Sequence, residues 1–323
     1  MKIFKTTLIL LALCLVTSVY GQKTINKTFD GVESIRINIA SGNGIIKKSN
    51  SDQVKVTLEY TYDDDDYEPS FDQNGTTLRI KEEFDRGRRN WNMRGKSEWT
   101  LEIPDGLRVD MNTGSGNIEI TGLSIELDAS SGSGNVEVDN ITGDTRLSTG
   151  SGNIDARNMD GELRANTGSG TIRVSDGKGD ADLNTGSGNI RASRLEGAFE
   201  MNTGSGNVDA VAMIITDHSR FSTGSGNVDV ELGGELNSDL QLTTGSGNAT
   251  LDFNGVKIEG KFTMEANSKN SISAPFSFDK EYEEDGGNGW RGRNKRYVKE
   301  ATIGSKDIRI DISSGSGSAR VRK

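Results

Sequence analysis

A glycine-rich string returns along most of this chain at a nearly constant interval. Thr-Gly-Ser-Gly-Asn or a near copy begins at nine positions, and the first five intervals are 18 residues each, followed by 20 and 21. The copies begin at Thr113, Ser131, Thr149, Thr167, Thr185, Thr203, Thr223, Thr244 and Ser314. Degenerate copies lie at 40–44 and 266–270. A fixed period of this kind is typical of a repeat protein in which each unit packs only on its neighbours.

Apolar residues recur at fixed distances from the Thr or Ser that opens each copy, which we number position 0. Positions −2, +5 and +7 are apolar throughout, as in Met111, Ile118 and Ile120, and the residues between them are polar. Alternation of period two on both sides of a glycine turn predicts two short strands per copy, each with one buried face. The frequent Gly-Ser-Gly and the lack of a 3.6-residue stripe exclude a helix.

A strand-turn-strand unit of 18 residues cannot bury its own apolar face. Stacked copies do bury it, one rung upon the next at the strand spacing of about 4.8 Å. We therefore predict an all-β fold, a single-stranded parallel β-solenoid or β-helix with about 18 residues per rung and atypical capping rungs. A β-propeller is excluded because it needs about 40 residues per blade. We expect a right-handed winding, because parallel crossovers generally have that hand.

The residue types at the turn positions predict structural roles for glycine and asparagine. We expect glycine at +1 and +3 to supply backbone conformations with positive φ. Position +4 is Asn in seven of the first eight copies, with Thr171 as the exception, and in-register Asn side chains can hydrogen-bond to one another up a stack. This predicted structural turn ladder consists of Asn117, Asn135, Asn153, Asn189, Asn207, Asn227 and Asn248.

The start of the chain predicts its compartment. Residues 1–5 carry two lysines, an apolar run spans 8–16, and small or polar residues lead to Gly21. This pattern is that of a secretory signal peptide, here 1–21, cleaved after about Gly21. The run is shorter than the roughly 20 residues that span a bilayer, and no second run follows. We therefore expect a secreted protein with no transmembrane segment in the mature chain, either periplasmic or on the cell surface and extracellular.

The rest of the chain divides into two parts. Residues 22–108 alternate less regularly and are predicted to be an N-terminal capping β segment with charged loops. Residues 109–323 are predicted to be the solenoid repeats, with a loop insertion at about 277–300. Because Arg320, Arg322 and Lys323 follow the last copy, we expect their charges to protect an exposed final edge.

The segment from Trp99 to Ile120 joins a Pro-Asp-Gly entry to the first Gly-Ser-Gly-Asn rung. It resembles the bacterial family called "putative adhesin", secreted β-strand-repeat proteins of otherwise unknown function, and the likeness extends over about 25–323. The resemblance implies a β-solenoid at the cell envelope or outside the cell. It brings no catalytic residues with it.

Charge and composition exclude several functions. The formal net charge of −10 argues against nucleic-acid binding, which needs a basic stripe. A single histidine argues against His-based metal sites and a catalytic triad. Outward columns mix acids with arginines, whereas a metal-binding column would be acidic throughout. We therefore predict no enzyme, no cofactor and no metal site. The run at 63–66 could hold calcium through its carboxylates, and a solvated loop is the favoured interpretation.

We predict a secreted cell-envelope or surface β-solenoid, an adhesin or binding module without catalysis. A structural or regulatory envelope protein is the alternative, and a carbohydrate-active enzyme on a β-helix is less favoured. Surface glycans or another envelope protein are the expected partners.

Two loops place tryptophan among arginines, a combination suited to stacking on sugars and pairing with their acidic groups. Our hypothesis is that both form a patch for an acidic glycan, and the alternative is two flexible, solvated insertions. The possible ligand-binding residues are Arg86, Arg88, Arg89, Trp91, Arg94, Trp290, Arg291 and Arg293.

Overall fold

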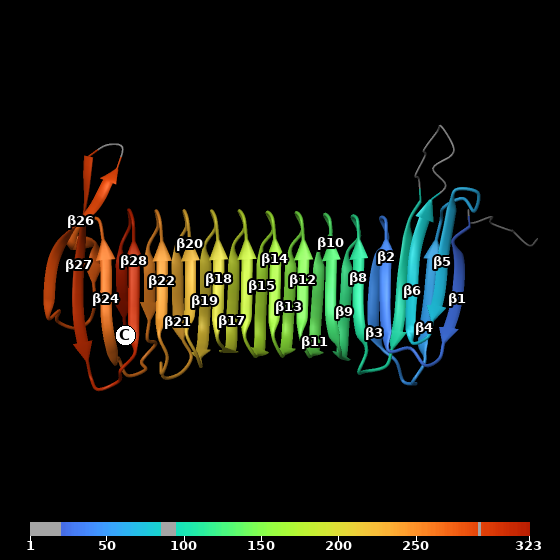
Figure 1. Ribbon diagram of the computed structural model, residues 1–323, viewed down its shortest axis with the longest axis horizontal. Helices are drawn as coiled ribbons and strands as arrows, with labels where there is room; N and C mark the ends of the chain where they lie inside the picture. Colours follow the sequence, from blue (N-terminus) through green and yellow to red (C-terminus); the bar gives the residue numbers. More distant parts are fainter. Residues whose placement is uncertain (1–20, 85–94, 290–291) are drawn as a thin grey trace, which may run out of the picture.

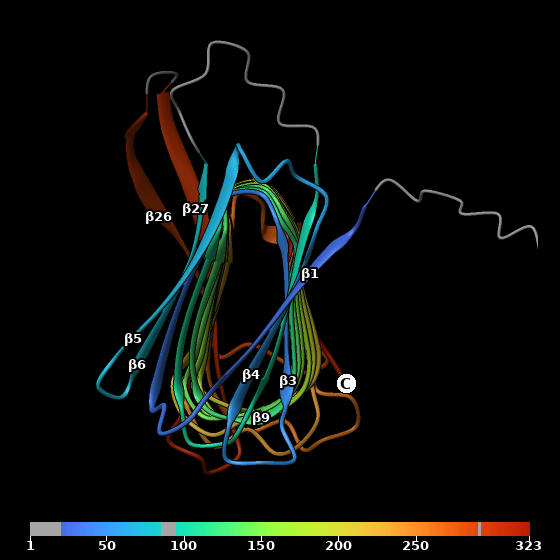
Figure 2. The same cartoon turned by 90° about the vertical axis from the view of Figure 1, so that its right-hand side faces the viewer.

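Two long β-sheets, here called sheet A and sheet B, make up the fold. The computed structural model describes residues 21–84, 95–289 and 292–323, and in these ranges the rest is turns and one 3-10 helix, Lys269–Ser271. The sheets lie face to face, and the chain passes between them at an upper and a lower edge (Figures 1 and 2). The predicted all-β fold with long parallel sheets is confirmed. No helix in the described ranges is long and apolar enough to cross a membrane.

Sheet A has fourteen strands in the described residues. In spatial order they are β1 (Lys23–Phe29), β4 (Val54–Tyr60), β7 (Ser97–Ile103), β3 (Asn43–Lys48), β9 (Ile118–Ser124), β11 (Val136–Thr142), β13 (Ile154–Asp160), β15 (Ile172–Lys178), β17 (Ile190–Gly197), β19 (Val208–Ile215), β21 (Val228–Leu232), β23 (Ala249–Asp252), β29 (Ala319–Arg322) and β25 (Ile272–Ser273).

Sheet B has fifteen strands in the same part of the chain. In spatial order they are β26 (Lys280–Gly289), β27 (Gly292–Ile303), β24 (Gly260–Ala266), β28 (Arg309–Ser314), β22 (Leu240–Thr244), β20 (Ser219–Thr223), β18 (Phe199–Thr203), β16 (Ala181–Thr185), β14 (Leu163–Thr167), β12 (Thr145–Thr149), β10 (Glu126–Ser131), β8 (Arg108–Thr113), β2 (Ser34–Ile39), β6 (Thr77–Phe84) and β5 (Tyr67–Asn74).

Central strands are parallel and in register from copy to copy. Ile154 pairs with Ile172 in sheet A, and Leu147 with Ala165 in sheet B. The apolar positions −2, +5 and +7 face the space between the sheets, as predicted: Ile172 has no exposed surface, whereas Arg173 beside it is exposed. The core is therefore a continuous column of aliphatic side chains that every rung extends.

The role predicted for glycine at +1 and +3 is wrong. Within the described residues no glycine of these turns has a positive φ. Glycine is needed because each turn stacks closely on the preceding one: a Cβ on Gly132 or Gly134 would overlap the carbonyl oxygen of Gly114 or Gly116. The constraint is the space between rungs, not the backbone conformation.

The Asn column forms a ladder, but not the one predicted. Each Asn side chain accepts a hydrogen bond from the backbone N–H of the next rung: Asn117 Oδ1 accepts from Asn135 N at 2.9 Å, and Asn135 Oδ1 from Asn153 N at 2.9 Å. One bond between two of these side chains is also present, Asn248 Nδ2 to Asn227 Oδ1 at 3.4 Å. The ladder satisfies backbone donors at the turn, which the side-chain pairing we expected would leave open.

The buried hydroxyl at position 0 is a second device that joins the rungs. Thr149 Oγ1 donates to the carbonyl oxygen of Gly134 in the preceding rung at 2.9 Å. The same oxygen accepts from Gly152 N in its own turn at 3.1 Å. Each of these hydroxyls therefore closes its own turn and binds it to the turn before.

Left-handed backbone occurs instead at position +9, in the second half of the central sheet A strands, where the ladder pairing skips one residue on both strands without a change of register. The non-glycine residues of this column have φ between 53° and 58°, and they are Asn140, Asn158, Asp176, Arg194 and Ala212. Asn and Asp tolerate this conformation better than other side chains. Strain is therefore greatest at Arg194 and Ala212.

The C-terminal end of the stack does not follow sequence order. Strands β28 and β29 pack directly on β22 and β23, and β24 and β25 lie outside them. β29 is therefore not the last strand of sheet A, but β25 pairs with it only at Ala319 and Arg320, so the expected protection of a final edge applies to the end of β29 at Arg322 and not to Arg320. The glycines decide the order: Gly315 and Gly317 stack closely on Gly245 and Gly247, whereas the copy at 266–270 has none.

The segment expected as a loop insertion at about 277–300 forms a hairpin instead. Strands β26 and β27 pair antiparallel, and β27 adds to β24, so the hairpin ends sheet B (Figure 1). Antiparallel strands also build the N-terminal cap, where β4 lies between β1 and β7 and β5 pairs with β6. Both ends therefore leave the parallel register.

One carboxylate completes the first rung. Glu82 Oε2 accepts the backbone N–H groups of Ala40 at 2.8 Å and Ser41 at 3.2 Å, donors that a preceding turn would otherwise meet. Its Oε1 accepts from Tyr67 Oη at 2.9 Å and Ser97 Oγ at 2.5 Å. Burial raises the pKa of Tyr67, so this hydroxyl stays protonated and donates. Glu82 thus supplies acceptors for backbone donors of the first rung, which has no turn before it.

The inward and outward faces predict unequal costs of a new charge. Ile172→Asp should lower the free energy of unfolding by at least about 3 kcal/mol, because an unpaired charge would be buried. Arg173→Asp, which removes an exposed ion pair with Asp155 at 3.4 Å, should cost less than about 1 kcal/mol. Chemical denaturation of both variants measures the difference, and equal losses would contradict the assignment of the faces.

The space between rungs predicts that a single methyl group is not tolerated. Gly152→Ala should lower the free energy of unfolding by about 1–3 kcal/mol or more, since its Cβ would overlap the Gly134 carbonyl oxygen. Ser151→Ala, at an exposed position of the same turn, should change it by no more than about 0.5 kcal/mol. Urea denaturation compares them, and a harmless Gly152→Ala would refute the close-approach argument.

The cap predicts a local loss of protection. Glu82→Ala should lower stability by about 3 kcal/mol, because buried donors lose a charged acceptor. Hydrogen exchange at the amides of Ala40 and Ser41 should accelerate first. Glu83→Ala, at the exposed neighbouring position, is the control. Unchanged exchange in the Glu82 variant would show that these donors do not depend on the carboxylate.

Candidate functional site

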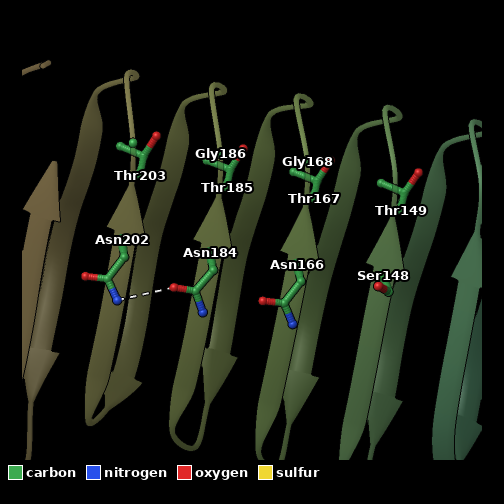
Figure 3. A pocket seen from close by; sticks show the side chains of 11 residues that line it. Ser148, Thr149, Asn166, Thr167, Gly168, Asn184, Thr185, Gly186, Asn202 and Thr203 are labelled. Atoms are coloured by element: carbon green, nitrogen blue, oxygen red, sulfur yellow. Dashed lines mark hydrogen bonds between the residues drawn. The ribbon is translucent and has the colours of Figure 1, made fainter. Parts of the chain in front are cut away.

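A polar trough of about 440 Å³ runs along the upper edge of sheet B across four rungs. Positions −1, 0 and +1 of successive copies line it (Figure 3). Its residues are Ser148, Thr149, Asn166, Thr167, Gly168, Asn184, Thr185, Gly186, Asn202, Thr203 and Gly204. We call this surface the polar trough.

The repeat itself creates this hollow. At position 0 the Thr side chain points inward and is buried, as in Thr167. At +1 the absence of a side chain, as in Gly168, leaves backbone as the floor. At −1 the side chain points outward, so Asn166 and Asn184 form a wall (Figure 3). The close stacking that demands glycine therefore also opens the trough.

Hydrogen bonds divide the wall into two halves. Asn202 Nδ2 donates to Asn184 Oδ1 at 3.2 Å, and Asn184 Nδ2 donates sideways to Asp182 Oδ1 at 2.5 Å. In the described part of the chain the side chains of Asn166 and Ser148 have no hydrogen-bond partner (Figure 3). One half is internally bonded, and the other presents free donors and acceptors to solvent.

No lining residue of the trough is charged or titratable between pH 3 and 9. Amide and hydroxyl groups donate and accept hydrogen bonds, but they supply neither a general acid and base pair nor an activated nucleophile. The arrangement suits binding of an uncharged polar ligand.

A second hollow, also of about 440 Å³, lies at the lower edge of sheet A. Its floor is apolar because Gly177 interrupts a column that holds Met159 and Leu195. Arg194 pairs with Asp176 at its rim through bonds of 2.6 and 2.7 Å, and this hydrogen bonding lowers the pKa of Asp176. The rim charges therefore neutralise one another.

The predicted chemistry at other positions can be placed. His218 is exposed. In the run at 63–66, Asp64 pairs with Lys23 at 2.8 Å and accepts from Tyr60 Oη at 2.9 Å; the hydrogen bond from Lys23 is the main cause of its lowered pKa. Among the residues that the structure describes, no three His, Cys, Asp or Glu side chains converge on a metal position.

The predicted ligand-binding loops fall where the structure gives no description. Arg86, Arg88, Arg89, Trp91, Arg94, Trp290 and Arg291 lie outside the described residues, and so does 1–20 of the expected signal peptide. Arg293 belongs to β27, but its side chain is not described. The acidic-glycan patch stays a prediction. We did not predict the trough from the sequence, although Asn or Ser precedes Thr-Gly in the four rungs that line it.

These features define the class: a repeat β-solenoid whose regular turns carry an uncharged polar surface. The sequence matches the model of the Toastrack family, DUF4097, over residues 32–277. The chain therefore belongs to this family, which confirms the resemblance drawn from residues 99–120. No curated protein matches the chain.

Three solved structures are similar to it at low identity. A "putative cell adhesion protein" from Clostridium sporogenes is 11% identical, with 94% of this chain and 98% of that chain covered and a TM-score of 0.24. A "putative adhesin" from Bacteroides fragilis is 13% identical with the same coverage and a TM-score of 0.36. A "putative lipid binding protein" from Parabacteroides distasonis is 13% identical over 94% and 97%, with a TM-score of 0.41.

Proposed function

We propose that the mature chain is a non-catalytic binding module of the cell envelope or surface, and that its ligand lies in the polar trough. The observation that carries the proposal is the trough itself, an open hollow across four rungs lined by Asn, Ser and Thr side chains and glycine backbone, with no charged group. Such a surface fits an extended polymer better than a compact small molecule, because small-molecule sites are enclosed and mostly apolar.

The composition of the trough supports binding over catalysis. Glycoside hydrolysis needs two carboxyl groups flanking the bond that breaks, and the lining holds none. Two acids beside the wall, Asp182 and Glu200, already accept hydrogen bonds from Asn184 and Asn202. A carbohydrate-active enzyme is therefore the less favoured function, and a purely structural or regulatory envelope protein is the alternative.

The proposed location rests on the sequence. Residues 1–21 have the pattern of a signal peptide, so the proposed module acts in the periplasm or outside the cell. Protease treatment of intact cells distinguishes the two places, because only an externally displayed chain would be cleaved.

The trough predicts which side chains binding depends on. The double change Asn166→Leu and Asn184→Leu should reduce binding to whole cells at least about tenfold, because buried sugar or peptide polar groups would lose their partners. The changes keep side-chain size and lie on an outward face, so the thermal unfolding transition should stay nearly unchanged.

The matched control is Asn112→Leu with Ser130→Leu, at the same position of two rungs outside the trough. It should bind as the unchanged protein does. Full binding by the trough variant, or equal loss in both variants, would refute the proposed site. If no cell or polymer binds the unchanged protein, the structural or regulatory alternative replaces the proposal.

A further inference from the structure

We infer that the polar trough takes a neutral, extended glycan chain that lies along the stack with one sugar ring facing each rung. The inference rests on the proposed function and names the ligand class and its orientation. Four steps lead to it: the direction of the trough, the absence of charge, the pairing of its strands, and the unequal halves of its wall.

The direction follows from the repeat. Positions −1, 0 and +1 line the trough in three successive rungs, and positions −1 and 0 line it in the rung of Thr149; rungs are spaced by about 4.8 Å. A ligand along the stack meets an identical set of groups at each rung, whereas a ligand across it meets one set only. Successive rings of an extended β-1,4-linked pyranose chain are spaced close to this distance and are turned over alternately, so each ring can face one rung, with alternate rings presenting opposite faces.

The absence of charge selects among polymers. Nucleic acid and acidic glycans need Lys or Arg to pair with phosphate or carboxylate, and none lines the trough. Sugar hydroxyls both donate and accept hydrogen bonds, as the Asn amides and Ser hydroxyls of the wall do. A neutral glycan is thus the polymer whose polar groups these side chains can match.

The pairing of the strands argues against an extended peptide. Peptides commonly bind a sheet by adding a strand to a free edge. Strands β12, β14, β16 and β18, which carry the trough, are each paired on both sides. Their backbone groups are therefore occupied, and the ligand must be recognised by side chains.

The two halves of the wall predict where contacts are strongest. The amide of Asn166 and the hydroxyl of Ser148 have no partner in the described protein, whereas Asn202 and Asn184 bond to each other and to neighbouring side chains. A ligand gains most where it breaks no existing bond. Asn166 is therefore the main determinant, and Asn202 contributes less.

No aromatic side chain lines the trough, which limits the binding free energy that each sugar ring can contribute. Without ring stacking, each sugar contributes only through hydrogen bonds, so the affinity should rise roughly threefold to tenfold per added ring. The rise should stop at about four rings, when the four rungs are filled. Length dependence with a plateau is the signature of this geometry.

The test is calorimetric titration of the protein lacking residues 1–21 with neutral β-linked oligosaccharides of two to six rings, built from glucose, mannose or N-acetylglucosamine. Oligogalacturonates of the same lengths are the acidic series. We expect one neutral series to bind with affinity rising to four rings and then constant, and the acidic series to bind more weakly. Asn166→Leu should reduce tetrasaccharide affinity more than Asn202→Leu, and Asn112→Leu should have no effect.

The outcomes separate the two proposals. If binding to cells depends on the trough but no neutral series binds, if affinity does not change with length, or if the acidic series binds more tightly, this inference is overturned and the proposed function stands. If the trough variants leave cell binding intact, the proposed function fails with it. Thermal unfolding of each variant confirms that the fold is retained.

Discussion

The close approach of each upper turn to the one before it is the constraint on which the structure depends. A side chain at +1 or +3 would overlap a carbonyl oxygen of the neighbouring turn, so glycine is obligatory wherever a turn lies on that side. The first rung is the instructive case: Ile39 pairs with Thr113, so Ala40 occupies position +1 and carries a side chain there. Its neighbour is not another turn but the carboxylate of Glu82. The hydroxyl and Asn columns then use the short distance to bond one rung to the next.

Near the lower edge, the stacked rungs adopt a left-handed backbone conformation that costs conformational free energy. A left-handed residue in a non-glycine position costs about 1–2 kcal/mol, and the column at +9 repeats this cost from Asn140 to Ala212. The left-handed conformation persists because the paired strands on both sides hold the backbone in place. Arg194 also gains a two-pronged bond to Asp176 in the same column. Beside Ala212 of this column, apolar side chains replace polar ones, and Val211 and Ile214 are left 45% and 40% exposed.

The period of the sequence was sufficient to predict the parallel sheets and the buried columns, because both follow from alternation and from identical spacing. The period could not show why the turn positions are glycine, because a requirement for positive φ and a requirement for close approach both select glycine. The order of the C-terminal rungs was equally hidden: Ser314 stacks on Thr244 only because the chain from 253 to 308 turns outward and returns. The trough was predictable in composition from Asn166 and Asn184, but its depth arises from glycine and an inward Thr together.

The trough has a finite length of four rungs, which lie inside the stack and away from its capped ends. An uncapped solenoid would offer unpaired strands at both ends and add further copies. Here antiparallel hairpins close sheet B at both ends. Between the caps, the trough covers the four rungs whose residues at position −1 are Ser148, Asn166, Asn184 and Asn202. It ends where the hydroxyl of Ser222 donates a hydrogen bond to Asn202. A repeat scaffold of this kind needs no strong single contact, because weak identical contacts add along a ligand of matching period. The same stacking that orders the core therefore sets the length of the ligand that we propose for the trough.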